Sequence, residues 1–439
     1  MISTPVCDFV RAYAASAPVR LHMPGHKGRG ILGCESLDIT EIRGADDLYH
    51  PEGILARSEE NASRLFGCRT VYSAEGSSLA IRAMLYLAYT RSGCKGRCLA
   101  GRNAHKSFLH TAVLLDFPIS WLWAGDSYLS CPVTAEIVEA AILAEQEKPF
   151  AVYLTSPDYL GNLAPVGEIA NVCHRHGVPL LVDNAHGAYL KFLPRSLHPM
   201  DLGADLCCDS AHKTLPVLTG GAYLHISKCA PEAMAERAKA AMALFGSTSP
   251  SYLTMASLDL CNRYLAEGYP SRLEETVRRL SSLREALTAR GWRVEDSDPL
   301  RLIIAAPDGL TGTALAGRLR QSGVECEYAD RDFLVLMATP ENAPADFDRL
   351  LAALGENHAP YAPSAVLPLA KGERACSIRE ALFAAQETVP VEASLGRVCG
   401  APTVACPPAI PIAVSGEVIG PEALALFRYY GVETVDVLK

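Results

Sequence analysis

The sequence has no apolar run long enough to cross a membrane and no basic cluster suited to a phosphate backbone. A membrane-spanning helix needs roughly 18 or more nearly continuous apolar residues, and no stretch approaches that length. The net charge is −9, and no basic block stands out against it, which argues against a nucleic-acid partner. The first residues also lack the basic and apolar segments of a secretory signal. We therefore expect a cytoplasmic protein that binds neither a membrane nor nucleic acid.

The 15 cysteines lack the paired spacing of a zinc ribbon. We expect most of them to be reduced core residues. The one metal-like cluster is Cys173-His174-Arg175-His176, which falls in the last turn of a helix predicted over 166–177. Basic residues in that turn complement the helix dipole, so the sequence predicts no metal site.

After residue 50, short apolar runs alternate with amphipathic segments over about 215 residues. This is roughly the span of one large domain. This alternation is typical of a mostly parallel β-sheet with helices on both faces, an α/β fold. We expect four parts: an N-terminal arm over 1–50, a large domain over 51–262, a smaller α+β domain over 263–358 and a C-terminal module over 359–439. Strands are predicted over 71–74, 97–100, 119–123, 151–155, 178–182 and 206–208, and helices over 54–66, 77–89, 106–115, 134–147 and 166–177. In the smaller domain, strands are predicted at 292–294, 302–305, 323–328 and 333–337, with a helix over 313–321.

Two predicted strands end in residues that suit one cofactor. The strand over 178–182 is followed by Asp183, and the strand over 206–208 leads to Ser210-Ala211-His212-Lys213, where 213 − 183 = 30 residues separate acid and amine. In open parallel sheets the ligand crevice lies beyond the carboxyl ends of the strands. Pyridoxal phosphate (PLP) needs an amine for its aldehyde and a carboxylate for its ring nitrogen. The alternative is a surface lysine and an aspartate that caps a helix.

Other predicted strand ends carry residues that would complete such a site. Gly76-Ser77-Ser78 opens a helix whose N-terminus suits a phosphate, although serine is also a common N-cap. His105 follows the next strand, where its ring could stack on a flat cofactor or serve structure alone. A loop that contains His22 and His26 is rich in glycine and lets backbone approach an anionic ligand.

With these residues in place, the sequence resembles the Orn/Lys/Arg decarboxylase family, which is PLP-dependent and has fold type I, the aspartate-aminotransferase framework. The resemblance covers nearly the whole chain and looks like a short form without an N-terminal receiver-like domain. Its motifs are His22-Met23-Pro24-Gly25-His26-Lys27-Gly28, Asp38-Ile39-Thr40-Glu41, Asp46-Asp47-Leu48, Arg102-Asn103-Ala104-His105-Lys106-Ser107, Thr155 to Gly161, Asp183-Asn184-Ala185-His186-Gly187, Ser210-Ala211-His212-Lys213, Ser247 to Asp259 and Val389 to Val398.

The resemblance implies α-decarboxylation of arginine, lysine or ornithine to an amine or polyamine precursor. It implies that Lys213 forms the Schiff base, that Asp183 pairs with the pyridinium nitrogen and that His105 stacks on the ring. His212 joins these as a catalytic residue. The other implied cofactor-binding residues are Gly76, Ser77, Ser78, Ala185, His186, Ser210, Thr248 and Ser249, with the last two reaching a neighbouring subunit of a homodimer or an assembly of dimers.

The substrate remains open at this stage, with arginine slightly favoured because short forms often serve polyamine synthesis. A cationic substrate needs acids around it. The candidate substrate residues are His22, His26, Glu41, Asp46, Asp47, Glu325, Glu327 and Glu392. Departures from the family pattern stand at Asn184, Asp158, Cys406 and Ala409, and they bear on substrate choice. The alternatives are a fold-type-I aminotransferase or lyase and a non-catalytic PLP-binding regulatory relative.

Overall fold

The structure is a computed structural model that describes residues 2–125, 130–361, 367, 369–401 and 410–439. The chain forms two compact units. The first contains residues 1–96, 148–153 and 166–272, and the second contains residues 97–147, 154–165 and 273–439. The four-part division predicted from the sequence stays a prediction.

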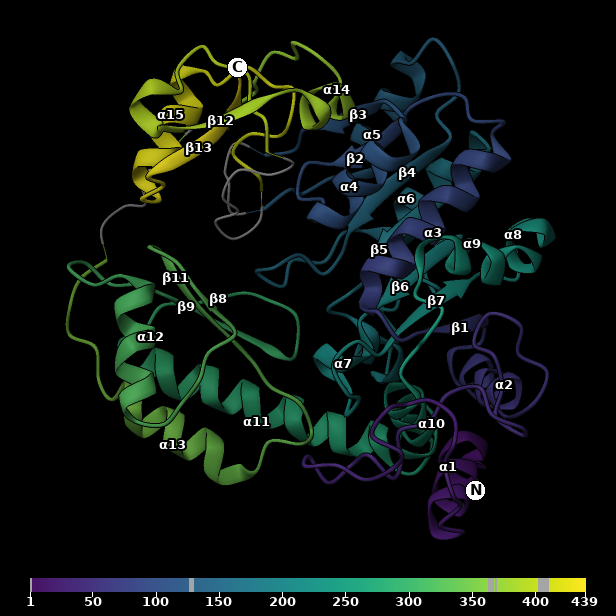
Figure 1. The fold of residues 1–439 in the computed structure, drawn as a ribbon. Coiled ribbons are helices and arrows are strands. Elements are labelled where there is room, and N and C mark those ends of the chain that lie inside the picture. The colour runs from purple at the N-terminus through teal and green to yellow at the C-terminus, as the bar shows by residue number, and fades with distance from the viewer. Residues whose placement is uncertain (1, 126–129, 362–366, 368, 402–409) are drawn as a thin grey trace. The chain divides into compact units, whose positions relative to one another are not determined.

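A seven-stranded sheet in the order β1-β7-β6-β5-β4-β2-β3 is the main element of the fold (Figure 1). The strands β2 and β3 are parallel, as are β5 and β6, whereas β7 is antiparallel to both β6 and β1. The strand bounds are β1 Arg69–Ser73, β2 Cys98–Gly101, β3 Ile119–Leu122, β4 Ala151–Thr155, β5 Leu180–Asp183, β6 Leu206–Asp209 and β7 Ala222–Ile226. The predicted mostly parallel sheet is therefore confirmed, with each predicted strand shifted by no more than two residues at either end.

Strand β7 is the one strand of this sheet that was not predicted from the sequence; β12 (Gln386–Pro390) and β13 (Thr434–Leu438) of the second unit were not predicted either. Strand β7 follows β6 after only a four-residue helix, α7 (Ala211–Thr214), so it has no long helix before it. An antiparallel neighbour can be reached by a short connection, whereas a parallel one needs a crossover of a dozen or more residues. The strict β–α alternation assumed from the sequence therefore fails at this point.

Helices of the first unit pack on the sheet, and one of them, α1, belongs to the N-terminal arm. Helix α3 (Gly76–Arg91) packs on β7, β6 and β5, while α1 (Pro5–Ala15), α2 (Ile54–Phe66) and α10 (Tyr252–Ala266) pack against one another (Figure 1). The other helices of this unit are α6 Val166–Arg175, α8 Glu232–Glu236 and α9 Ala238–Phe245. Helix α2 ends at Gly67, as predicted, because this glycine adopts the left-handed conformation with φ 75°.

Helix α1 lies within residues 1–50, the predicted N-terminal arm, where no helix was predicted. Val6 and Val10 lie on its buried face. At its start the carboxylate of Asp259 accepts hydrogen bonds from the N–H groups of Val6 (2.9 Å) and Cys7 (3.0 Å). Proline at the first helical position, here Pro5, is the sequence signal that predicts this start.

The second unit contains a four-stranded antiparallel sheet in the order β10-β11-β9-β8 and a two-stranded sheet of β12 and β13. The strand bounds are β8 Val294–Glu295, β9 Arg301–Ala305, β10 Tyr328–Ala329, β11 Phe333–Met337, β12 Gln386–Pro390 and β13 Thr434–Leu438. The helix bounds are α4 Lys106–Leu115, α5 Ala135–Ala144, α11 Tyr269–Ala289, which begins in the first unit, α12 Gly312–Gln321, α13 Pro344–Leu354, α14 Ile378–Phe383 and α15 Pro421–Tyr429. The strand predicted over 323–328 is wrong except at its last residue.

None of the helices in the described part of the chain has the length and hydropathy of a membrane span. Cys406 and Ala409 lie outside the described residues.

Candidate active site

Asp183 presents a buried carboxylate at the carboxyl end of β5. It is 2% exposed, and the hydroxyl of Tyr153 donates to its Oδ2 at 3.1 Å. The N–H of Ala185 and the thiol of Cys208 donate to its Oδ1 at 3.1 and 3.5 Å. None of the cationic side chains in the described residues forms an ion pair with it. A buried charge is stable only with a compensating partner, so this carboxylate suits a bound cation.

Lys213 lies in α7, which follows β6, the strand next to β5. Strand β6 pairs in parallel with β5, with Asp183 opposite Cys208. The Lys213 Nζ and His186 Nε2 are hydrogen-bonded at 2.9 Å, and His186 is 7% exposed. The predicted acid and amine therefore come from adjacent parallel strand ends at the same edge of the sheet.

The turn from β1 into α3 provides an N-terminus that is open to an anion. Gly76 has φ +72°, and a Cβ placed there would meet nothing within 4 Å. Glu75 stands at the N-cap but makes no side-chain cap, because its carboxylate accepts the N–H of Ser247 at 2.6 Å instead. The Ser210 hydroxyl donates to the Ser77 hydroxyl at 2.8 Å. Two hydroxyls and the start of a 16-residue helix thus converge, which suits a phosphate group.

Several other predicted cofactor residues adjoin this edge. The ring nitrogen Nδ1 of His212 lies 3.0 Å from the carbonyl oxygen of Gly221, which orients the ring. Thr248 and Ser249 are exposed and follow Ser247, the residue that contacts Glu75. Ser78 lies in the first turn of α3 beside Ser77.

His105 lies in the second unit, where it is the N-cap of α4. Its Nδ1 accepts the N–H of Ser107 at 3.2 Å and lies 3.0 Å from the Ser107 hydroxyl. Stacking of His105 on a cofactor ring stays a prediction.

The acidic candidates for substrate binding are held in three different ways. Asp46 is 8% exposed and its carboxylate accepts the N–H groups of Glu52, Gly53 and Leu55 at 3.0, 2.7 and 3.0 Å, so it closes a loop. Burial opposes the charge on Asp47, yet the N–H of Tyr49 and the ring of His50 outweigh it, and the pKa of Asp47 is lowered. Glu392, in the second unit, is an exposed partner of Arg428, which lowers the Glu392 pKa.

The remaining candidates lie in the arm and in the small sheet. Glu41 is exposed. His22 Nε2 lies 2.8 Å from the hydroxyl of Tyr13, and His26 Nε2 lies 3.1 Å from Asp38. In the second unit, Glu327 accepts from Tyr159 at 3.1 Å and Glu325 pairs with Arg320 at 3.0 Å.

Two features of the site were missed or misread in the sequence. Tyr153 lies inside β4, and a tyrosine in a buried strand gives no pattern that marks it as a donor to Asp183. Asp158, a departure from the family pattern, is 3% exposed and accepts the N–H groups of Leu160 and Asn162 at 3.0 and 2.9 Å. It therefore closes its own loop.

Known proteins match this chain over most of its length. The family described as Orn/Lys/Arg decarboxylase, major domain, matches residues 4–306. The arginine decarboxylase of Halalkalibacterium halodurans is 31% identical over 97% of this chain and 93% of its own, and that of Bacillus subtilis is 30% identical over 96% and 92%. Among solved structures, lysine decarboxylase LdcF of Francisella novicida has a TM-score of 0.83 at 18% identity, covering 100% of this chain and 81% of its own. The constitutive lysine decarboxylase of E. coli has a TM-score of 0.80 at 18% identity, covering 100% and 82%. These likenesses confirm the predicted fold class.

Proposed function

Because the chain belongs to the Orn/Lys/Arg decarboxylase family, we propose that its reaction is the removal of the α-carboxylate of arginine as CO2. That the chain is a decarboxylase enzyme follows from the family. The choice of arginine is supported by two relatives of that name that match nearly the whole chain. The lysine decarboxylases among the solved structures are only 18% identical, so they bear on the fold and not on the substrate.

The cofactor of the enzyme is pyridoxal phosphate, on which this family depends. When bound, its protonated ring accepts the electrons that are left at the substrate Cα as CO2 departs. The residues present fit this group, since they offer a buried carboxylate that forms no ion pair within the described part of the chain, an amine just after the neighbouring strand, and a helix start with two hydroxyls and no side-chain cap.

Each part of the first unit has a role in this proposal. Lys213 binds the cofactor aldehyde covalently and Asp183 keeps the ring nitrogen protonated, because a neighbouring carboxylate raises the pKa of a pyridine. Ser77 and Ser210 hold the phosphate with the first N–H groups of α3. His186, hydrogen-bonded to the Lys213 Nζ at 2.9 Å, orients the amine and can exchange a proton with it.

The observation that carries the proposal is that Asp183 ends β5 and Lys213 lies in α7, directly after the parallel neighbour β6. Three donors hold the buried Asp183 carboxylate, and His186 is hydrogen-bonded to the Lys213 Nζ. Borohydride treatment of the PLP-loaded protein followed by peptide mass spectrometry should place the label on Lys213. Label on any other lysine would overturn the assignment.

A competition experiment between amino acids identifies the substrate. We expect the purified PLP-loaded protein, given equal amounts of arginine, lysine and ornithine, to release CO2 and form agmatine at least tenfold faster than cadaverine or putrescine, because a tenfold preference needs only about 1.4 kcal/mol of differential binding. Mass spectrometry identifies the products. Preferential formation of cadaverine or putrescine would change the substrate, and formation of a keto acid with pyridoxamine phosphate would replace the decarboxylase with an aminotransferase.

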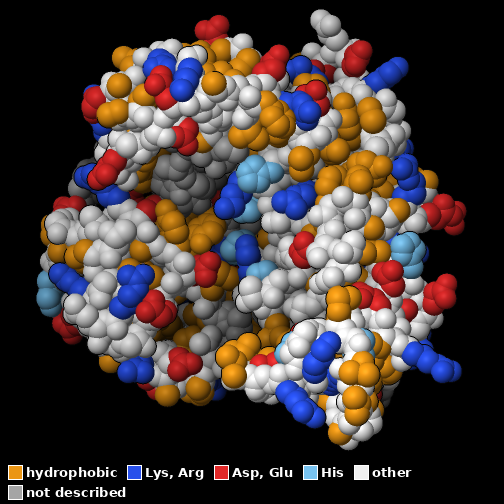
Figure 2. Space-filling model, in the orientation of Figure 1, with side chains coloured by type: hydrophobic (Ala, Val, Ile, Leu, Met, Phe, Trp, Pro, Cys, Tyr) orange, Lys and Arg blue, Asp and Glu red, His pale blue; other side chains and the backbone are white. Residues whose placement is uncertain are grey.

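We further propose that the enzyme is a homodimer or an assembly of dimers, with Thr248 and Ser249 near a site completed by the partner. This assembly is proposed because residues 17–37 of the N-terminal arm expose large apolar side chains. They are Val19 (87%), Leu21 (92%), Met23 (69%), Ile31 (101%) and Leu32 (83%). Hydrophobic side chains are visible on the surface in the lower part of Figure 2, where Figure 1 draws the arm in purple. Clustered exposed apolar side chains mark interaction surfaces. The cytoplasmic location stays a prediction.

A further inference from the structure

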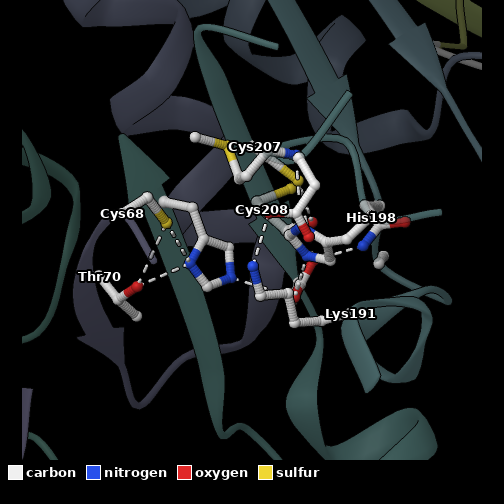
Figure 3. Close-up of polar contacts among 12 residues, drawn as sticks. Cys68, Thr70, Lys191, His198, Cys207 and Cys208 are labelled. Carbon is white, nitrogen blue, oxygen red and sulfur yellow. Dashed lines mark hydrogen bonds and ion pairs between the residues drawn. The ribbon is translucent and has the colours of Figure 1, made fainter. Parts of the chain in front are cut away.

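A buried cluster of polar side chains lies directly behind the proposed cofactor site. Its centre is Asp209, the last residue of β6, which is fully buried and directly precedes Ser210. The carboxylate Oδ2 accepts from His198 Nε2 and His225 Nε2, both at 3.0 Å. Figure 3 shows Cys68 and Thr70 on one side of this cluster and His198 on the other.

The hydrogen bonds of His198 and the raised pKa of His225 together indicate one positive charge in the cluster. The N–H of Met200 donates to His198 Nδ1 at 3.3 Å, so the proton of a neutral His198 is on Nε2, facing Asp209. Burial lowers the pKa of His198, which agrees with this neutral form. Burial also opposes the charge on His225, but Asp209 outweighs it and raises the His225 pKa to about 9. Asp209 is thus a carboxylate balanced by one imidazolium, which a fully buried charge requires.

Asn184 connects the cluster to the residues that follow Asp183. Asn184 Nδ2 donates to Asp209 Oδ1 at 2.7 Å, and the Asn184 N–H donates to the Cys208 carbonyl at 3.0 Å. Asn184 directly follows Asp183. A Cβ at Gly187 would lie 1.9 Å from Asn184 Oδ1, so the side chain is confined by the backbone around it.

A carboxylate at position 184 would face Asp209 at hydrogen-bond distance, and two buried like charges repel. An amide avoids this because its NH2 group donates to the carboxylate. Asn184 is therefore matched to Asp209, and the pair ties the end of β5 to the end of β6.

We propose that Asn184 and Asp209 are positioning residues for the cofactor. They hold Asp183, at the end of β5, and Lys213, in α7, at a fixed separation. His198 and His225 in turn hold Asp209. Neither Asn184 nor Asp209 touches the reacting atoms. The inference rests on the proposed roles of Asp183 and Lys213. It concerns how tightly the cofactor is bound and in what environment, so it does not depend on which amino acid is decarboxylated.

The same residues offer a second interpretation. One atom each of His198, Cys207 and Asp209 lies within 4.8 Å of the other two, a grouping that could hold a metal ion. A metal bound by His198 Nε2 would replace the hydrogen bond between that nitrogen and Asp209. It would also need a Cys207 thiolate, whereas burial raises the pKa of that thiol well above its usual range. The hydrogen-bonded cluster accounts for these contacts without a metal.

The test compares Asn184→Ala with a control of similar type, Asp205→Asn. Asp205 precedes β6, is 7% exposed, and accepts from His174 at 3.1 Å and from the N–H of Leu180 at 2.8 Å, so it is a second His–Asp pair at the opposite end of the same strand. Each variant is prepared without cofactor, its melting temperature is measured, and PLP is titrated by absorbance.

We expect both variants to melt below the wild type, because each loses a buried hydrogen bond. Only Asn184→Ala should bind PLP about tenfold more weakly, with a changed absorption spectrum of the bound cofactor, since the residues after Asp183 lose their hydrogen bond to Asp209. The double variant Asn184→Ala/Asp209→Ala should bind PLP no more weakly than Asp209→Ala, because Asp209→Ala already removes the acceptor of the Asn184 hydrogen bond.

Equal PLP affinity in Asn184→Ala and wild type would overturn the inference, as would the same loss of affinity in Asp205→Asn. Additive losses in the double variant would also contradict it. If the wild type bound no PLP, the proposed cofactor site itself would fail, which is a distinct result. Stoichiometric zinc in the purified wild type, absent from Asp209→Asn by elemental analysis, would replace the positioning role with a metal site.

Discussion

At the scale of single residues, the proposed site depends on buried polar groups that are held from several sides. The Cys208 thiol is an example: burial, and then the charge of Asp183, raise its pKa well above the usual range, so it remains protonated and donates to the Asp183 Oδ1. Tyr153 donates to the other oxygen. Neutral donors thus hold both oxygens of the Asp183 carboxylate.

His225 should give the stability of the protein a particular pH dependence. Its pKa is raised to about 9 in the folded protein, against an ordinary value of 6.5. Its stabilising effect is therefore complete below pH 6.5 and is lost as the pH rises through 9. The groups that face it are Asp209, Cys68, Thr70 and His198.

We expect urea unfolding to show that His225→Gln is much less stable than the wild type at pH 6.5 and that the difference shrinks by pH 9. His198, whose pKa burial lowers, acts in the opposite direction and loses stability as the pH falls below 6.5, so the comparison is confined to the higher window. A difference in unfolding free energy that does not change between pH 6.5 and 9 would contradict an imidazolium at position 225.

At the scale of elements, strand register brings the site together. Because β5 and β6 run parallel with Asp183 opposite Cys208, the residues that follow each strand emerge side by side at one edge. Helix α3 begins at the same edge, in the turn that contains Gly76. There the Gly76 N–H donates to the Gly220 carbonyl at 2.7 Å. Parallel strand ends and a helix start together make the carboxyl edge of the sheet the place for ligands.

A buried ion pair connects distant elements within the second unit. Arg102, just after β2, donates to both oxygens of Glu417 at 2.7 Å, and the two side chains are 1% and 6% exposed. The guanidinium also lies 4.9 Å from the ring centroids of Trp121 and Trp123. This pair ties the strand that leads to His105 to a segment near the C-terminus.

We expect Arg102→Ala to lower the free energy of unfolding by about 3 kcal/mol, because it leaves Glu417 buried and unpaired. The double variant Arg102→Ala/Glu417→Ala should lose less than the sum of the two single variants. Chemical denaturation measures both. Arg428→Ala, which breaks the exposed pair with Glu392, is the control and should leave the unfolding midpoint nearly unchanged. A strictly additive double variant would show that the buried pair does not couple these elements.

At the scale of the whole molecule, the N-terminal arm has apolar side chains that a single chain leaves exposed. Among its large apolar side chains, Ile31 and Leu32 are more than 80% exposed. In a symmetric dimer the same patch is used on both copies, so a small arm can cover a substantial interface.

We expect Ile31→Ser/Leu32→Ser to shift the protein from dimer toward monomer in light scattering and to reduce activity in parallel, because the patch would no longer bury apolar area on association. Leu143→Ser, at an exposed apolar residue of α5, is the matched control and should change neither. A wild-type protein that is fully active as a monomer would contradict the proposed assembly.

The sequence by itself determined the alternation of strands and helices, the strand ends that carry Asp183 and Lys213, and the glycine that ends α2. These features are local, because periodicity and capping depend on residues a few positions apart. Resemblance to the family added the cofactor and the reaction class, and the family match supports both.

Only the tertiary structure decided that Asp46 and Asp158 close loops, that Tyr153 donates to Asp183 and that Asn184 is paired with Asp209. It also decided that β7 runs antiparallel. These contacts join residues that are distant in sequence or depend on strand register. In solvent they would be weak and screened, but in the buried interior the stability of the fold depends on them. No local pattern carries that information, because the cost of an unpaired buried group arises only after the chain has folded around it.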